Sequence, residues 1–501
     1  MQSIMTLLNS VGITLLSEGY RIGLDWLGQF VQTIIDSVGI IGVGIICFTL
    51  ILKAITLPFD TYQRYTTRKQ TLIMRSMRED LDKLQKQYAN DKTMYNQKMM
   101  ELYKKNGYSV FGACLPMIIS FVVIIVAFQG FNAYSRYANL DFFVQMSSSY
   151  NAAITAHGTE GIDFMLADRA SEEEGYRLVY TNADGTEQSL SFGAPGESVT
   201  EGECSYTIAQ NGDILYLYVT PLEEEKFISY SYSLEATSVS KEYTIDTDRL
   251  LAYLQTNDAA AYESIASITS AEDRDTACLD YVKKIGADSA RDWYLNNRAN
   301  FLWVENVWYP DVSYNHPIPQ DYATFQQNFG SNTQVTLADG STAQLSSVFQ
   351  QANYDDLTAS LSEQKEEPNG YFGLIIISIA LMVVSQVVMM RSSKESRQYQ
   401  TVDGQGSAAR TQKIMLVTMP LIYAVFAFMY SAAFTIYMLI SSLFSLLVTL
   451  LSNLILGIIF KKKEEKKAIA QIGYKPQWMI EREAHEKQEK GKSRKNKDKK
   501  E

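Results

Sequence analysis

Apolar stretches long enough to cross a membrane constrain the fold of this chain more than any other feature. A helix needs about 20 apolar residues to span the hydrocarbon core of a bilayer. Such stretches occur at 37–57, 111–131 and 371–390, and a fourth run, 414–460, is too long for one crossing. Residues 430–433 (Tyr-Ser-Ala-Ala) are the expected turn within that run. The sequence therefore predicts an α-helical polytopic membrane protein with five spans.

The distribution of charge predicts how these spans are oriented. Residues 131–369 carry a net charge of −25 and the rest of the chain +14, so the overall value of −11 is an average over two populations. The segments 60–107, 391–413 and 461–501 all contain more bases than acids. Because short loops rich in Lys and Arg stay cytoplasmic, we expect these three segments inside, residues 131–369 outside, the N-terminus outside and the C-terminus inside.

Together the two patterns predict the following organisation. It comprises an outer-leaflet amphipathic helix (1–36), a first span (37–58), a cytoplasmic helical hairpin (59–109), a second span (110–131), an inserted acidic extracytoplasmic α+β domain (132–369), a third span (370–390), a cytoplasmic loop (391–413), a fourth span (414–430), a fifth span (433–460) and a basic cytoplasmic tail (461–501). Residues 1–36 lack the basic start and the small-residue cleavage site of a signal peptide. An uncleaved sixth span is the alternative for this segment.

Segment 59–109 has the pattern of two helices joined by a short break. Apolar residues at helical spacing form one seam before Ala89-Asn90-Asp91 and another after it, and Asn106-Gly107 is a helix C-terminal signal. The seam residues are Met77, Leu81, Leu84 and Tyr88, then Tyr95, Met99 and Leu102. The pattern predicts an antiparallel hairpin of the coiled-coil kind.

Several short motifs within the five-span region resemble one known family. They are Lys53 followed five residues later by Pro58, residues 83–88 with Asp91, residues 99–104, Cys114-Leu115-Pro116, Gln386, Pro420, Tyr437 with Ser441, and Phe301-Leu302-Trp303 followed by Pro310-Asp311. In their order and spacing these resemble the YidC family of membrane protein insertases, which includes mitochondrial and chloroplast homologues. The chain departs from the family at Lys53, where the family has Arg, and at Ala432-Ala433, where it has Pro-Gly. Further departures are Ser109-Val110, Ala113, Ser120 and Lys98.

The resemblance implies a polar, positively charged groove open to the cytoplasm and to lipid. A cation within a span normally faces a bundle interior or a water-filled cavity, which is the role expected of Lys53; the alternative is that its side chain snorkels to the inner headgroups. Interhelical hydrogen bonding is the alternative for each of the polar side chains of the spans. The candidate groove and substrate-contact residues are Lys53, Thr49, Thr56, Ser120, Gln129, Gln386, Tyr437 and Ser441.

The sequence contains no motif for catalysis or cofactor binding. It has no phosphate-binding G-x-x-x-x-G-K-[ST] loop, and His157, His316 and His485 lack the spacing of metal ligands. Cys204 and Cys278 both fall in the acidic region, and the sequence leaves open whether they form a disulfide. We therefore expect no enzyme activity, no metal and no cofactor.

The acidic region contains two patterns of its own. Residues 176–245 alternate apolar and polar residues between turn signals, which indicates antiparallel hairpins, and residues 246–300 have a helical pattern. In family members with a large outer domain, that domain precedes the core, so the resemblance implies nothing about the role of the domain predicted here.

The function predicted from the sequence is insertion and chaperoning of membrane proteins in a bacterial inner membrane, without nucleotide hydrolysis. The expected partners are nascent membrane proteins, the Sec translocon and the ribosome, with the last contacted by the hairpin and the tail. Anionic lipid is a further expected partner of the tail, and DNA is not expected. The alternatives are a membrane-anchored receptor or adhesion module that acts through residues 131–369 and, less well supported, a transporter.

Overall fold

The computed structural model describes residues 10–106, 110–159, 175–181, 186–211, 214–234, 239–330, 332–392, 418 and 420–473. Its residues divide into two compact units. The first unit contains Met1–Gly42, Gln129–Gly373 and Phe428–Ala433, and the second contains Val43–Phe128, Leu374–Ala427 and Phe434–Glu501. The predicted loop 391–413 and tail 461–501 lie largely outside the described residues.

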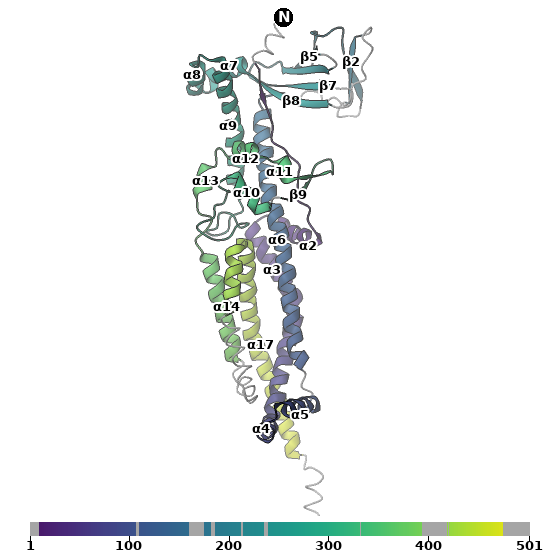
Figure 1. Cartoon of the computed structure of the whole chain (residues 1–501), viewed down its shortest axis with the longest axis vertical. Helices are drawn as coiled ribbons and strands as arrows, with labels where there is room; N and C mark the ends of the chain where they lie inside the picture. The colour runs from purple at the N-terminus through teal and green to yellow at the C-terminus, as the bar shows by residue number, and fades with distance from the viewer. Residues whose placement is uncertain are drawn as a thin grey trace, which may run out of the picture. The chain divides into compact units, whose positions relative to one another are not determined.

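An antiparallel sheet of six strands forms one part of the first unit (Figure 1). Its strand order is β1-β8-β7-β6-β5-β4. The strands are β1 (Ser10–Ile13), β4 (Ser198–Glu201), β5 (Cys204–Asn211), β6 (Ile214–Pro221), β7 (Ile228–Leu234) and β8 (Val239–Asp246). A separate hairpin of β2 (Tyr176–Thr181) and β3 (Glu187–Phe192) shares an apolar cluster with β5, β6 and β7. The antiparallel hairpins expected over 176–245 are thus present.

The N-terminal segment differs from the single amphipathic helix expected over 1–36. Residues Ser10–Ile13 form strand β1, whose Ser10 pairs with Asp246, and the helix α2 covers only Trp26–Val38. The side chain of Asp25 caps α2 by accepting from the amide of Gly28 at 2.7 Å. The apolar residues expected on one helix are therefore divided: those before Asp25 belong to a strand and a loop, and those after it to α2.

Helices form the remainder of the first unit. They are α6 (Val110–Thr155) from Gln129 onward, α7 (Thr247–Asn257), α8 (Ala259–Ala266), α9 (Ala271–Asn297), α10 (Tyr322–Phe329), α11 (Leu345–Val348), α12 (Gln351–Leu357) and α13 (Ser362–Glu366). A small hairpin of β9 (Gln334–Thr336) and β10 (Thr342–Gln344) accompanies them. The helical pattern noted over 246–300 corresponds to α7, α8 and α9. One apolar cluster runs through these helices and includes Phe143, Tyr150, Val282, Phe325 and Tyr354.

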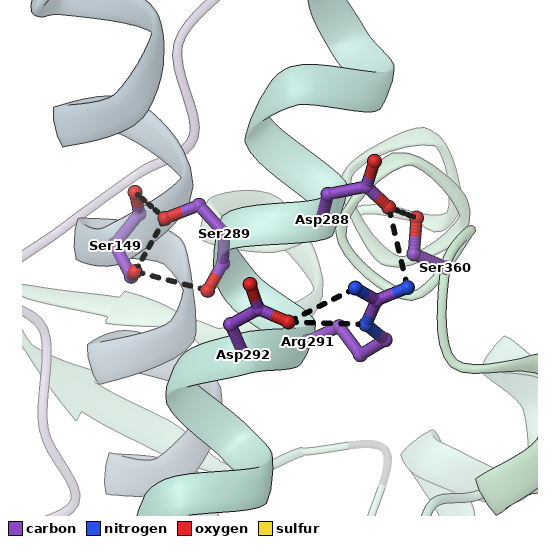
Figure 2. Close-up of polar contacts among 6 residues, drawn as sticks. All are labelled: Ser149, Asp288, Ser289, Arg291, Asp292 and Ser360. Atoms are coloured by element: carbon purple, nitrogen blue, oxygen red, sulfur yellow. Dashed lines mark hydrogen bonds and ion pairs between the residues drawn. The ribbon is translucent and has the colours of Figure 1, made fainter.

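Helices α6 and α9 approach each other closely, as Figure 2 shows. The hydroxyl groups of Ser149 and Ser289 are 2.9 Å apart, and each also hydrogen-bonds the other residue's carbonyl. A Cβ atom on Gly286 would lie 2.6 Å from the ring of Tyr150, so only glycine fits at this position. On the far side of α9, Asp288 accepts from Ser360 at 2.6 Å and ties the segment after α12 to the same helix.

The second unit consists of long helices and one short hairpin. It contains α3 (Ile41–Ser76) from Val43 onward, α4 (Arg78–Gln87), α5 (Lys92–Lys105) and α6 up to Phe128. It also contains α14 (Gly373–Ser392) from Leu374 onward, the helix over Pro420–Met429 up to Ala427, and α17 (Ala432–Gly473) from Phe434 onward. Two helices continue past the positions at which the predicted first and second spans end. Helix α3 passes through Pro58 without ending, and α6 continues beyond residue 131 to Thr155. Proline costs an interior helix one hydrogen bond but does not oblige it to stop.

The long helices of the second unit expose many apolar side chains. Two helices of the described residues are long and apolar enough to cross a membrane, Ile41–Thr66 and Ala432–Ile455, and shorter apolar helices cover Gly373–Val388 and Pro420–Met429. On α17 the exposed side chains are almost all aliphatic: Leu443, Leu447, Leu450, Leu451, Leu454, Ile455 and Ile458. Exposing such a surface to water is costly. The predicted second span lies on α6, where the side chains of residues 110–121 lie outside the described residues, and the number of spans stays a prediction.

Candidate functional site

The cation predicted within the first span lies on the buried side of α3. Lys53 is half-buried, and Thr49, one turn before it on the same face, is fully buried. The opposite face carries the exposed apolar side chains Ile51 and Ile55, which are 41% and 58% exposed. Lys53 therefore points away from the apolar stripe of its helix, as expected for a side chain that faces the interior of a bundle.

The two threonines beside Lys53 make hydrogen bonds within their own helix. The Thr49 hydroxyl donates to the carbonyl of Ile45 at 2.7 Å, and the Thr56 hydroxyl donates to the carbonyl of Lys53 at 3.3 Å. These bonds satisfy the hydroxyl protons, while each oxygen retains acceptor capacity. The structure thus brings Thr49, Lys53 and Thr56 together along one helix face.

Polar groups on α14 and α17 form a second part of the predicted set. Tyr437 is buried and hydrogen-bonds Ser441 one turn later. The side-chain carbonyl oxygen of Gln386 and the hydroxyl of Thr435 are buried, and neither has a hydrogen-bond partner among the described residues. A buried polar atom without a partner is costly. Water or a bound polar segment would supply the missing hydrogen bonds.

Two of the predicted residues do not join this set. Gln129 is exposed and belongs to the first unit, whereas the other seven belong to the second. Ser120 lies on α6, but its side chain falls outside the described residues. The structure adds a pair that the sequence did not single out, since the hydroxyl of Tyr423 donates to that of Ser378 at 2.8 Å and links the Pro420–Met429 helix to α14. A single tyrosine within an apolar run gave no local signal of this bond.

The segment of the predicted hairpin contains two helices, α4 and α5, with a small apolar core. Asp91 caps α5 by accepting from the amides of Thr93 and Met94, at 3.1 and 3.0 Å. Met77, Leu81 and Tyr103 are buried together, with Ile73, Met99 and Leu102 packed against them. Lysines on the outer surface, including Lys83, Lys86, Lys104 and Lys105, are exposed. The hairpin therefore presents a basic surface that its own core does not use.

Shortening Leu81 tests whether this core holds the two helices together. Leu81 is 1% exposed, so L81A is expected to destabilise the hairpin by about 2–4 kcal/mol, because buried Leu→Ala changes lose both transfer energy and packing. Amide hydrogen exchange over α4 and α5 should accelerate. Met100→Ala is the matched control, since Met100 is 45% exposed on the same hairpin. Equal exchange in the two variants would contradict the packing described here.

A polar clasp in the first unit, formed by Asn306, Asp311 and Asn369, connects two loops. All three side chains are buried, and those of Asp311 and Asn369 are 0% exposed. Asn369 accepts from the Asn306 amide at 2.8 Å and donates to the carbonyls of Asn306 and Pro310 at 3.0 and 2.8 Å. Asp311 accepts from the amide of Tyr371 at 2.9 Å. The clasp fixes residues 305–311 against the residues that lead into α14.

The loop held by the clasp also contacts the first residues of three helices. The carbonyls of Tyr309 and Val307 accept from the amides of Ala432 and Ala433, both at 2.8 Å, and so satisfy free donors at the start of α17. A Cβ atom on Gly373 would lie 2.4 Å from the Trp303 ring, and one on Gly42 would lie 2.1 Å from the Phe301 ring. The loop that contains Phe301-Leu302-Trp303 thus packs against the first residues of α3, α14 and α17.

Groups that could support catalysis or metal binding are few in the described part of the chain. Within it, no group of three or more His, Cys, Asp or Glu side chains could hold a metal ion. Cys204 and Cys278, whose pairing the sequence left open, are free thiols buried in different apolar clusters. Burial raises the pKa of the Cys278 thiol to about 11, which disfavours a reactive thiolate. His485 lies outside the described residues.

Comparisons with known proteins agree with the sequence motifs. Residues 33–165 match the model of the family described as 60Kd inner membrane protein. A membrane protein insertase YidC of Fusobacterium nucleatum is 31% identical over 109 residues, which are 22% of this chain and 51% of that protein. The insertase YidC of Caldanaerobacter subterraneus is 30% identical over 117 residues, 23% of this chain and 55% of that protein.

A third relative, also a YidC insertase by name, is covered over a smaller share of its length. The YidC of Haemophilus influenzae is 31% identical over 108 residues, 22% of this chain but only 19% of that protein. The chain spans about half the length of the first two curated relatives. No solved structure matches it.

Proposed function

This chain belongs to the YidC family of membrane protein insertases through its residues 33–165, and we propose that it inserts membrane proteins into the bilayer by way of a polar groove that contains Lys53. The relatives are named as membrane protein insertases, and the activity of the whole chain is our proposal. The observation that carries it is the position of Lys53 on the buried face of α3, opposite exposed Ile51 and Ile55.

The proposed mechanism needs no nucleotide. Polar side chains in the groove and the water they retain lower the cost of bringing a polar segment partway across the hydrocarbon core. Lys53 attracts acidic residues of the passing segment, because charges interact strongly where the dielectric is low. The apolar segment then leaves sideways into lipid, and the transfer of apolar surface out of water drives this step.

The remaining polar groups have defined parts in the proposal. Thr49, Thr56 and Ser441 offer acceptors, and Gln386 and Tyr437 contribute polar groups from α14 and α17. Ser120 and Gln129, both on α6, are proposed as further contacts. The unpartnered atoms of Gln386 and Thr435 support a hydrated interior, since water can satisfy them when no substrate is present.

The basic hairpin and tail are proposed to bring the substrate to the groove. Exposed lysines of α4 and α5 supply positive charge beside the proposed entrance, and the ribosome offers a dense phosphate surface to which such lysines bind. Anionic lipid is the other proposed partner of the tail. The Sec translocon is a further proposed partner, and we place the chain in a bacterial inner membrane as a multi-pass protein.

A depletion and rescue experiment tests the activity directly. A bacterium whose own insertase can be switched off is transformed with this chain, and insertion of a single-span reporter is followed by protection from external protease. We expect restored growth and a protected reporter fragment. Insertion no better than with an empty vector, from a chain shown to reach the membrane, would reject the proposed function.

The helix α2 is proposed to lie in the outer interface of the membrane. Its buried face, Leu27, Val31 and Ile35, packs in the first unit, while Trp26 is 73% exposed and Phe30 is 38% exposed on another face. Tryptophan favours the headgroup level. We therefore expect brominated lipids to quench Trp26 in reconstituted vesicles.

Two matched variants separate this signal from the other tryptophans. W26F should remove more of the lipid-quenched emission than W293F, because Trp293 is only partly exposed and packs on Phe142. The centroids of these two rings are 5.5 Å apart. An equal loss in both variants, or no loss in W26F, would show that α2 does not reach the lipid.

A further inference from the structure

One face of the six-stranded sheet is rich in hydroxyl-bearing side chains, which lie there beside Ala209, Asn211, Ile214 and Asp246. Side chains alternate between the two faces of a strand, and one face of β5–β7 is apolar because it packs on the β2–β3 hairpin. The opposite face, here called the hydroxyl face, carries Ser205, Thr207, Tyr216, Tyr218, Thr220, Ser229, Ser231, Ser233, Ser240, Glu242 and Thr244. Serine and tyrosine hydroxyls on a strand face accept and donate hydrogen bonds but contribute no apolar core.

The strand register makes many of these side chains direct cross-strand neighbours. Thr207 lies opposite Tyr218, which lies opposite Ser231 on the next strand. Ser205 lies opposite Thr220, and Ser229 lies opposite Thr244. Opposite residues on one sheet face are within about 5 Å of each other. The hydroxyls therefore form a continuous array across four strands.

A cavity of about 230 Å³ lies over this array. Its lining residues include Ser205, Thr207, Tyr218, Thr220, Ser229 and Thr244, all of which bear hydroxyl groups. The Tyr218 ring stacks with that of Tyr216 at a centroid distance of 6.3 Å, so two aromatic rings lie side by side on the same face. The hydroxyl face is thus hollowed and combines hydrogen-bonding groups with aromatic surface.

The charges around the cavity restrict the class of ligand. Arg249 is the one cation among the lining residues, and its guanidinium donates to the carbonyl of Pro221 at 2.8 Å and lies 3.5 Å from the carboxylate of Asp246. It is therefore occupied in holding the chain after β6, and a phosphate or a nucleic acid would find no free cation among the lining residues. The hydroxyl array likewise offers little to an apolar segment.

We propose that the hydroxyl face binds a neutral, polyhydroxylated ligand of the oligosaccharide class. Serine and threonine hydroxyls can exchange donor and acceptor roles to match sugar hydroxyls, and the rings of Tyr216 and Tyr218 offer apolar surfaces for the faces of sugar rings. This site is distinct from the groove of the second unit and does not depend on the insertase proposal. It gives the first unit a binding role of its own.

The test uses the full chain in lipid nanodiscs and three neutral probes: maltohexaose, cellohexaose and N-acetylated chitohexaose. Titration calorimetry should detect at least one of them with a dissociation constant of about 0.1–1 mM, as expected for a shallow polar site. The triple variant T207V/T220V/T244V keeps side-chain shape and strand preference while it removes three hydroxyls, and we expect it to weaken binding about ten-fold or more.

Further variants and outcomes make the result decisive. Y218A, which removes an aromatic surface instead of hydroxyls, should weaken binding comparably, whereas the matched changes T336V and Y314A outside the face should not. Insertion of the reporter should be unchanged in the triple variant. The proposal is overturned if no probe binds at concentrations up to about 10 mM, or if the variants bind as the parent chain does. It is also overturned if the triple variant dissociates a dimer, since the occupant is then a second copy of this chain.

Discussion

Replacing Asn369 with leucine is expected to destabilise the first unit by at least about 3 kcal/mol, because the change leaves several buried polar groups without partners. Leucine has nearly the shape of asparagine but neither its donor nor its acceptor. The amide of Asn306 and the carbonyls of Asn306 and Pro310 lose their bonds to the Asn369 side chain, which is 0% exposed, so water cannot easily replace it. Thermal unfolding in detergent, followed by near-ultraviolet circular dichroism, measures the loss.

The effect of N369L should spread to the helix starts. Because the loop of Asn306 also accepts hydrogen bonds from the amides of Ala432 and Ala433, its release should accelerate hydrogen exchange at the beginning of α17. Asn257→Leu is the matched control, since Asn257 is exposed and its side chain bonds only the carbonyl of Tyr253 in its own helix. If N369L unfolds within about 1 kcal/mol of N257L, the clasp does not hold the loops as described.

The hairpin shows how much of this fold could be predicted from sequence. Its seam residues Met77 and Leu81 recur at helical spacing, and Asp91 follows a short polar break, so local pattern alone indicated two helices and where the second begins. In the structure Met77, Leu81, Met99 and Leu102 of the two seams belong to the apolar cluster together with Tyr103, whereas Leu84, Tyr88 and Tyr95 do not. The residues of this cluster all lie between Ile73 and Tyr103, so its packing joins residues close in sequence.

The ends of the long helices could not be predicted in the same way. Pro58 and the change of composition after residue 131 are local signals for an end, yet α3 and α6 continue past both. In α6 the continuation is stabilised by distant partners, because Phe143 and Tyr150 pack against residues of α9, α10 and α12. In α6, therefore, tertiary packing outweighs the local sequence signal for a helix end after residue 131.

The clasp and strand β1 were missed for a related reason. Strand β1 has four residues, and its partner β8 lies more than 200 positions later in the chain, so no periodic pattern reveals the pairing. Asn369 is one polar residue in the segment before an apolar stretch, and its partner Asn306 is 63 positions away. Of the groove residues, the sequence identified Lys53 from its chemistry, but only the burial pattern of α3 indicates the direction in which it points.

Lys53→Glu should reduce insertion of a reporter with an acidic flanking segment about ten-fold or more, because a carboxylate in place of the ammonium turns attraction into repulsion at low dielectric. Lys53→Arg should retain most activity, since it keeps the positive charge and restores the residue that the family resemblance implies. Insertion into vesicles is measured as the protease-protected fraction of the reporter. Lys69→Glu is the matched control, with the same charge change on the same helix at an exposed position.

Exchanging the charge of the substrate distinguishes a groove contact from a folding defect. If Lys53 acts by attracting the flanking segment, a reporter whose acidic residues are replaced with lysine should be inserted better by K53E than by the parent chain. A misfolded variant would fail with both reporters, and K53Q, which removes the charge without reversing it, should fall between the two for each reporter. A parent chain that inserts acidic and basic reporters equally, together with a fully active K53E, would contradict the role of Lys53 and leave the groove without its central residue.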